Sequence, residues 1–219
     1  MKTRSATVLL VSFLCMSKLW ALAIAIGNEP KKARIRIRIW DTVQVPRETL
    51  DQAETVTEKV YEHAGIEIAW FHCVAVPKPE NFACASPVGP GDIVVRIYLS
   101  AKDIASKTSH FTGGAAIPLI ADGARGIVLL FYDHLERTAR HGKIPLEVVL
   151  GITMAHEIGH LLISPGHAVE GIMRGRLTHE DWLLASRGKL RFHPTEVETM
   201  RNRVFGLAQI VDAGSRNPN

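Results

Sequence analysis

The residues best suited to chemistry in this chain form the run His156-Glu157-Ile158-Gly159-His160. In a helix, residues four apart lie on one face, so His156 and His160 can offer two imidazoles to one metal ion. Glu157 directly follows the first histidine, where its carboxylate can reach a metal-bound water without ligating the metal. Metal-assisted hydrolysis needs such a Lewis acid, an open coordination position and a nearby base. The motif therefore predicts a zinc-dependent hydrolase, with a peptidase favoured.

A third protein ligand is needed if tetrahedral zinc is to keep one position for water. We predict His167, because Pro165-Gly166 ends the helix and lets the chain turn back beneath the metal. Glu180 is the rival ligand, since it lies on the next predicted helix, where some zinc peptidases place a glutamate. Glu170 is a third candidate.

Three features of the sequence together resemble the metzincin branch of the zinc metallopeptidases, in a small exported bacterial form. These features are the motif at 156–160, the downstream His167 and the turn Gly171-Ile172-Met173. The resemblance implies that Zn²⁺ is bound by the two motif histidines and His167. It also implies that Glu157 is the general base and that Met173 forms an apolar floor beneath the metal.

The spacing after the motif departs from the metzincin pattern. That family has a glycine three residues after the second histidine and its third histidine three residues later. Here Ile163 occupies the glycine position, and His167 arrives one residue late, just after Gly166. Arg174 follows the methionine where a tyrosine ligand would stand, so no fifth protein ligand is implied. The turn that leads to His167 must be built differently.

The first 25 residues have the layout of a secretory signal peptide. Lys2 and Arg4 precede an apolar run at 6–16, and the alanines within 21–25 offer small-residue cleavage sites. We therefore expect a secreted or periplasmic protein. The alternative is a membrane anchor retained over 7–26, because that stretch is nearly long enough to span a bilayer.

Without this segment the charge of the chain is almost balanced. Three of its 26 basic residues and none of its 22 acidic residues lie in the first 25, which leaves 23 basic residues. This balance indicates no nucleic-acid partner. Arg34, Arg36 and Arg38 alternate with isoleucines, which predicts the solvent-facing side of a strand. We expect a peptide or protein substrate, and no membrane partner after signal cleavage.

Two cysteines remain after cleavage, Cys73 and Cys84, on either side of a proline-containing loop at 76–80. In an oxidising compartment they are expected to form a disulfide that closes this loop. The alternative is two unpaired, partly buried thiols. Their spacing fits no common zinc motif.

Residues 26–219 are predicted to form a single zincin-like α/β domain with no internal linker. The expected architecture is a twisted, mixed, mostly parallel sheet of about five strands, an active-site helix with the metal motif, and a helical C-terminal part. Strands are expected over 33–42, 66–74, 92–100, 113–119 and 126–132, and helices over 46–64, 146–163, from 178 and over 194–208.

The strand at 113–119 is expected at an edge of the sheet, because glycine and proline are tolerated best there. The resemblance implies that an extended substrate adds to this edge as another strand.

Two other functions remain open. One is an exported protein that stores, buffers or displays zinc without catalysis, although a pure binding site has no use for Glu157 beside the open position. The other is a gluzincin-like peptidase in which Glu180 completes the ligand set.

Overall fold

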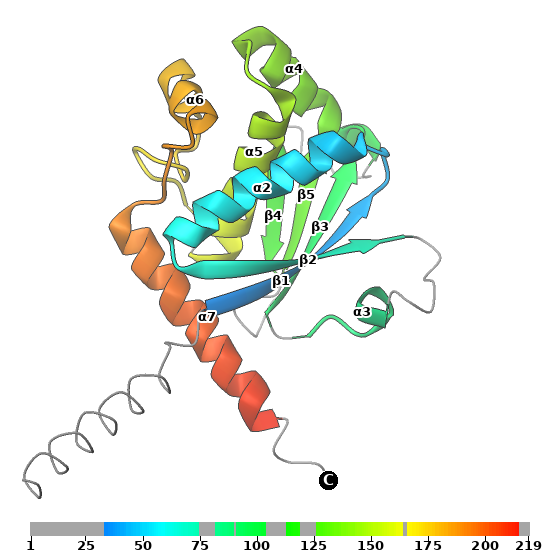
Figure 1. Cartoon of the computed structure of the whole chain (residues 1–219), viewed down its shortest axis with the longest axis vertical. Coiled ribbons are helices and arrows are strands. Elements are labelled where there is room, and N and C mark those ends of the chain that lie inside the picture. Colours follow the sequence, from blue (N-terminus) through cyan, green and yellow to red (C-terminus); the bar gives the residue numbers. More distant parts are fainter. Residues whose placement is uncertain are drawn as a thin grey trace, which may run out of the picture. The chain divides into compact units, whose positions relative to one another are not determined.

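Five strands form one mixed sheet in the order β2-β1-β3-β5-β4 (Figure 1). The computed structural model describes residues 33–74, 82–89, 91–103, 113–118, 126–163 and 166–214, so the predicted signal peptide lies outside the described residues. The elements are β1 (Ala33–Asp41), α2 (Arg47–His63), β2 (Ile66–Cys73), α3 (Phe82–Ala85), β3 (Asp92–Tyr98), η1 (Ala101–Asp103), β4 (Gly114–Pro118), β5 (Gly126–Phe131), α4 (Tyr132–Gly142), α5 (Leu146–Leu162), α6 (His179–Ser186) and α7 (Pro194–Gly214).

The sheet confirms the predicted α/β class. Strands β2, β1, β3 and β5 run parallel, and β4 pairs antiparallel with β5 at one edge. Parallel neighbours need a crossover, which α2 provides between β1 and β2. The predicted strand boundaries agree to within two residues at each end. The strand predicted over 92–100 ends at Tyr98, and Leu99 beyond it is 56% exposed.

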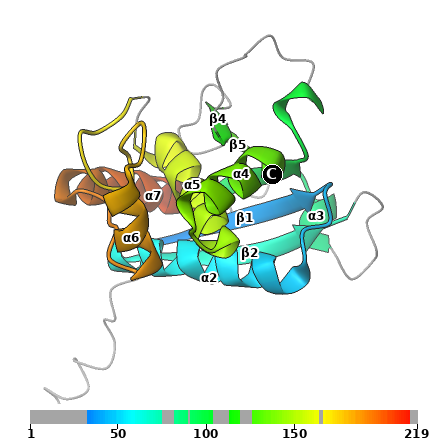
Figure 2. The ribbon, with the colours of Figure 1, turned by 90° about the horizontal axis from the view of Figure 1, so that it is seen from above.

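The main core lies between one face of the sheet and the helices α2, α4 and α5. Alternate residues of the strands point into it, and α5 is buried on nearly every side. Figures 1 and 2 show α2 lying beside α5 over the strands. Two buried hydroxyl groups of α2 join these helices: Thr57 donates to the Gly151 carbonyl (3.0 Å) and Tyr61 to the Ala155 carbonyl (2.9 Å).

Helix α4 is an element that the sequence analysis left unassigned. It begins at Tyr132, directly after β5, with no turn residues between them. Its buried stripe is short and consists of Tyr132, Leu135 and Ala139, while the rest of its surface is largely charged. The three- and four-residue spacing of that stripe was the available signal. Within the described ranges, no helix is both long and apolar enough to cross a membrane.

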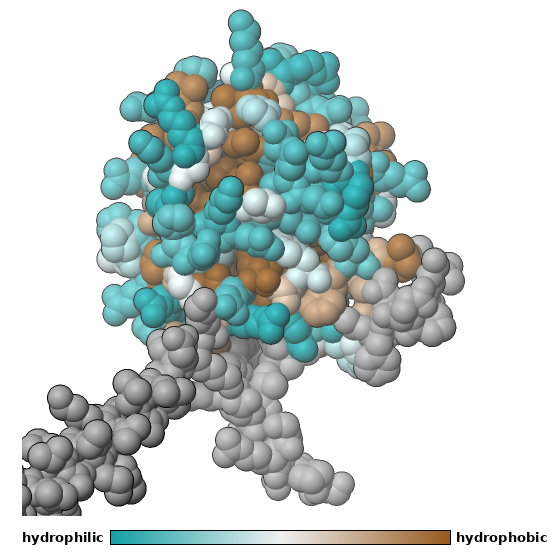
Figure 3. All heavy atoms as spheres, in the orientation of Figure 1, coloured by the Kyte–Doolittle hydropathy of each residue, from teal (hydrophilic) through white to brown (hydrophobic). Residues whose placement is uncertain are grey.

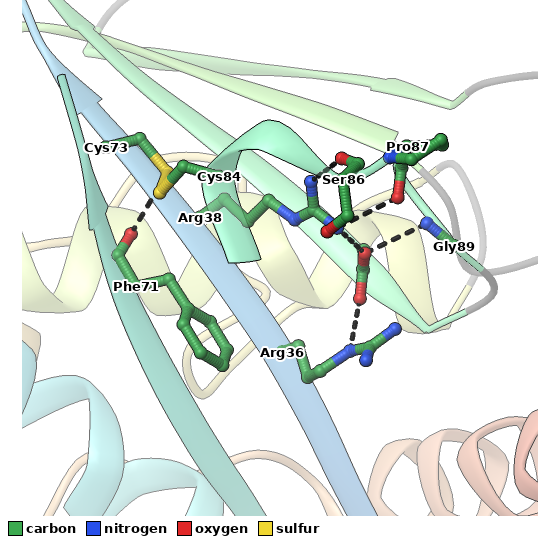
Figure 4. Close-up of polar contacts among 9 residues, drawn as sticks. Arg36, Arg38, Phe71, Cys73, Cys84, Ser86, Pro87 and Gly89 are labelled. Atoms are coloured by element: carbon green, nitrogen blue, oxygen red, sulfur yellow. Dashed lines mark hydrogen bonds and ion pairs between the residues drawn. A yellow bond between two sulfur atoms is a disulfide. The ribbon is translucent and has the colours of Figure 1, made fainter. Parts of the chain in front are cut away.

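The prediction that the arginines of β1 face solvent is wrong for Arg38, which is only 4% exposed (Figure 4). Its guanidinium pairs with the fully buried carboxylate of Asp92 at 2.5 Å and also donates to the Ser86 and Pro87 carbonyls. Arg36 pairs with the other oxygen of Asp92. A buried charge needs such partners, because its desolvation is otherwise uncompensated.

The segment that covers Arg38 is held to the sheet by the predicted disulfide. Cys73, the last residue of β2, is bonded to Cys84 in α3 with an S–S distance of 2.03 Å (Figure 4). The covalent link and the Arg38 hydrogen bonds thus anchor the same segment. Disulfides of this kind are typical of oxidising compartments.

Asp92→Asn is expected to lower the free energy of unfolding by about 3–5 kcal/mol, because it leaves buried Arg38 without its counter-charge. Urea denaturation of the wild-type and variant proteins measures the loss. The matched control is Asp133→Asn, which breaks the solvent-exposed pair with Arg137 and should cost less than about 1 kcal/mol. Equal losses in the two variants would contradict this account of the Asp92 cluster.

Candidate metal centre

Helix α5 brings the two motif histidines together. The Nε2 atoms of His156 and His160 lie 3.0 Å apart. Ligand atoms around tetrahedral zinc, with bonds of about 2.0–2.1 Å, are separated by roughly 3.3 Å. The two nitrogens therefore stand close to the separation that one zinc ion requires, and the four-residue spacing of a helix accounts for it.

The orientation of His156 is set by a backbone group that the sequence analysis did not identify. Its Nδ1 lies 2.6 Å from the carbonyl oxygen of Ile172. A carbonyl can only accept a hydrogen bond, so Nδ1 carries the proton and Nε2 presents a lone pair. Burial lowers the pKa of His156; the Ile172 hydrogen bond opposes that shift and His167 adds to it. His156 is therefore in the neutral, ligating form at neutral pH.

The third imidazole comes from the loop after α5. One nitrogen each of His156, His160 and His167 lies within 4.8 Å of the others, and the His167 ring centroid is 4.9 Å from that of His160. The loop folds back on itself, since the Ala168 N–H donates to the Met173 carbonyl (2.8 Å). Gly175 lies against the His167 ring, where an added Cβ would stand 2.9 Å from Cγ.

Met173, which the resemblance implies as the floor of the centre, packs against α5 at Gly159. Its side chain is buried, and its sulfur lies where a side chain at Gly159 would begin, 2.5 Å from the position of an added Cβ. Only glycine at 159, between the motif residues of α5, leaves room for this contact. The Ile172 N–H donates to the Arg191 carbonyl (3.0 Å), which holds the turn from its other side.

The side chain of Glu157 lies against the edge strand β4. Its carboxylate contacts Gly114 at the start of β4, where an added Cβ would lie 2.7 Å from Glu157 Cγ and 2.9 Å from Oε1. Glu157 is 8% exposed, and burial raises its pKa to about 7. A carboxyl with that pKa can both accept and release a proton near neutral pH.

A pocket of about 600 Å³ opens beside Glu157 and His156. Its walls come from α4, α5, α6 and the segment that follows Met173. They include the apolar side chains Leu135, Leu177 and Trp182. Figure 3 shows apolar residues among hydrophilic ones on the face where α4 and α6 lie. The volume and the apolar walls suit one or two side chains of a substrate.

The other predicted ligands lie outside this cluster. In the described part of the chain, Glu170 and Glu180 belong to none of the groups of three or more ligand atoms within 4.8 Å. Both residues instead line a separate hollow of about 400 Å³ beside α6. The geometry thus favours His167 over either glutamate as the third ligand.

The sequence matches no protein-family model and no curated protein.

Helix α6 anchors the loop that carries His167 and Met173. A capping box begins this helix: Asp181 N–H donates to Thr178 Oγ1 (3.2 Å), and Thr178 N–H donates to the Asp181 carboxylate (2.7 Å). Arg174 donates to the same carboxylate (2.7 Å) and to the Val169 carbonyl (2.7 Å). Burial raises the pKa of Asp181, but the hydrogen bonds from Thr178 and Arg174 outweigh it and hold that pKa below its ordinary value.

Asp181→Asn is expected to destabilise the protein at neutral pH and to make no difference in strong acid. The pKa of Asp181 is lower in the folded protein than in the unfolded chain, so its ionised carboxylate adds to the free energy of unfolding. This stabilisation is complete above the ordinary aspartate pKa, about 3.9, and is lost as the pH falls through the pKa of the folded state. Urea denaturation of both proteins from pH 7 down to pH 3 measures the difference. A difference that stays constant over that range would contradict the assignment.

Proposed function

We propose that this protein is a zinc-dependent hydrolase, specifically an endopeptidase of the metzincin type. The observation that carries the proposal is the convergence of three imidazoles beside a buried glutamate at the mouth of a pocket. Neutral imidazole is a preferred zinc ligand, and three protein ligands leave one position open. A site meant only to hold zinc would not need a buried carboxylate of raised pKa next to it.

His156, His160 and His167 would hold the zinc. Bound there, zinc would act as a Lewis acid that polarises a carbonyl oxygen and acidifies a water molecule. Glu157 accepts a proton at its carboxylate as water attacks the peptide carbonyl, and then delivers that proton to the leaving amine. Its enclosure between α5 and Gly114 keeps the carboxyl poorly solvated, which favours proton exchange near neutral pH.

The edge strand β4 supports a peptide as substrate. Within the described residues it pairs with β5 on one side only, so backbone groups of its other side can bind an extended chain as a further strand. Glu157 touches Gly114 at the start of the same strand, and the pocket begins there. A peptide on β4 would therefore run past Glu157 and place one side chain in the pocket.

Export to a secreted or periplasmic location is part of the proposal. The predicted signal peptide and the Cys73–Cys84 disulfide support it.

Glu157→Ala is expected to keep its zinc and to lose about 10²–10⁴-fold in peptide hydrolysis, because the base that accepts the proton is gone. Cleavage of a quenched-fluorescent peptide mixture, with the zinc content of both proteins matched, provides the measurement. Equal activity, or two inert proteins that both hold zinc, would contradict the peptidase and favour zinc storage or display.

His167→Ala is expected to weaken zinc binding, whereas Glu180→Ala is expected to leave it unchanged, because the imidazole and not the carboxylate lies with the other ligands. Zinc affinity measured by competition with a chelator distinguishes the two. The opposite pattern would establish the gluzincin-like ligand set.

Gly114→Ala is expected to slow hydrolysis on the order of 10–100-fold with zinc binding intact, because the new methyl group displaces Glu157. Gly206→Ala in α7 is the matched control, since an added Cβ there meets nothing within 4 Å. Full activity in Gly114→Ala would show that the placement of Glu157 against β4 is unimportant.

A further inference from the structure

A second cluster of metal-ligating side chains lies where α2 packs on β2. Asp51 and Glu54 stand three residues apart on α2, and His72 is near the end of β2. One ligand atom from each lies within 4.8 Å of the others. Strand β2 is at the opposite edge of the sheet from β4, so this cluster is separate from the centre that contains Glu157.

Glu54 is the buried member of this cluster, whereas Asp51 is exposed and His72 is half-buried. It is 7% exposed, and its Oε1 is buried with no hydrogen-bond partner. One turn further along α2, Glu58 Oε1 accepts a hydrogen bond from the indole of Trp70 at 2.6 Å. A buried carboxylate oxygen without a donor is costly, and a cation is one way to compensate it.

Nε2 of His72 lies 3.3 Å from that oxygen. The same nitrogen is 3.4 Å from Nη2 of Arg47, which can only donate. One ring nitrogen cannot donate to the carboxylate and accept from the guanidinium at once. A metal ion would satisfy both the imidazole lone pair and the carboxylate.

We propose that Asp51, Glu54 and His72 form a second site for a divalent metal ion, with Zn²⁺ the best fit. The separation of 3.3 Å between His72 Nε2 and Glu54 Oε1 equals the roughly 3.3 Å expected between two ligands of tetrahedral zinc. One imidazole and two carboxylates form a ligand set that zinc accepts. The fourth position is left to water.

Arg47 is the competing cation at this site. Its side chain is 64% exposed and pairs with Asp51 at 2.8 Å. Because its guanidinium is mostly in solvent, it can swing away when a divalent ion binds. Bound metal would join α2 to β2, and α2 in turn holds α5 through Thr57 and Tyr61. The site would therefore stabilise the fold without taking part in hydrolysis.

The proposal is tested by calorimetric titration of the metal-free full chain with Zn²⁺. The wild-type protein should bind two ions per chain, and His72→Ala should bind one and retain its peptidase activity. His141→Ala removes an exposed histidine elsewhere and should still bind two. Arg47→Met should bind the second ion more tightly than wild type, because the competing guanidinium is gone.

A variant that lacks both His156 and His160 isolates the second site from the first. It should bind one Zn²⁺ and unfold at a higher temperature when Zn²⁺ is added, and His72→Ala in this background should remove both effects. Asp51→Asn, an exposed change that leaves the core intact, should weaken the same binding. No Zn²⁺ bound by the variant that lacks His156 and His160, or unchanged binding by that variant after His72→Ala, would overturn the proposal. Both outcomes are distinct from a failure of the proposed hydrolase, which concerns Glu157 and the other centre.

Discussion

The hydrogen bond between His156 and the carbonyl of Ile172 is the interaction on which the candidate metal centre depends. It joins helix α5 to the loop that follows this helix, and it sets which nitrogen of the His156 ring is left to bind a metal. The same loop residue donates to Arg191, and the next residue, Met173, packs against Gly159. The orientation of His156, the packing of Met173 and the path to His167 therefore follow from one docking of loop on helix.

The buried carboxyl groups of Asp92 and Glu157 have different electrostatic surroundings. Asp92 is fully enclosed and meets two guanidinium groups and a backbone N–H, so its charge is compensated and it serves the structure. Glu157 is nearly as buried and lies against the backbone of Gly114, and burial moves its pKa toward neutrality. A carboxyl used for proton transfer needs this second environment, because a strongly paired carboxylate would not accept a proton near pH 7.

Helix α2 packs against α5 on one side and against β2 on another. Its buried hydroxyl groups bind carbonyls of α5, one of them directly before His156, while its acidic side faces β2. The disulfide and the Arg38 cluster lie on the opposite face of the sheet, away from the candidate metal centre.

The sequence by itself determined the α/β class, most element boundaries, the capping box of α6 and the nearness of His156 to His160, because these depend on local periodicity and short spacing. It predicted His167 from the helix-ending Pro165-Gly166 and from the resemblance, with Glu180 and Glu170 as alternative ligands. Only the tertiary structure decided that Arg38 is buried, that the Ile172 carbonyl orients His156, and that Gly114 confines Glu157. Each of these depends on groups that are brought together from separate parts of the chain, and the contact to His156 uses a backbone carbonyl, which every residue carries.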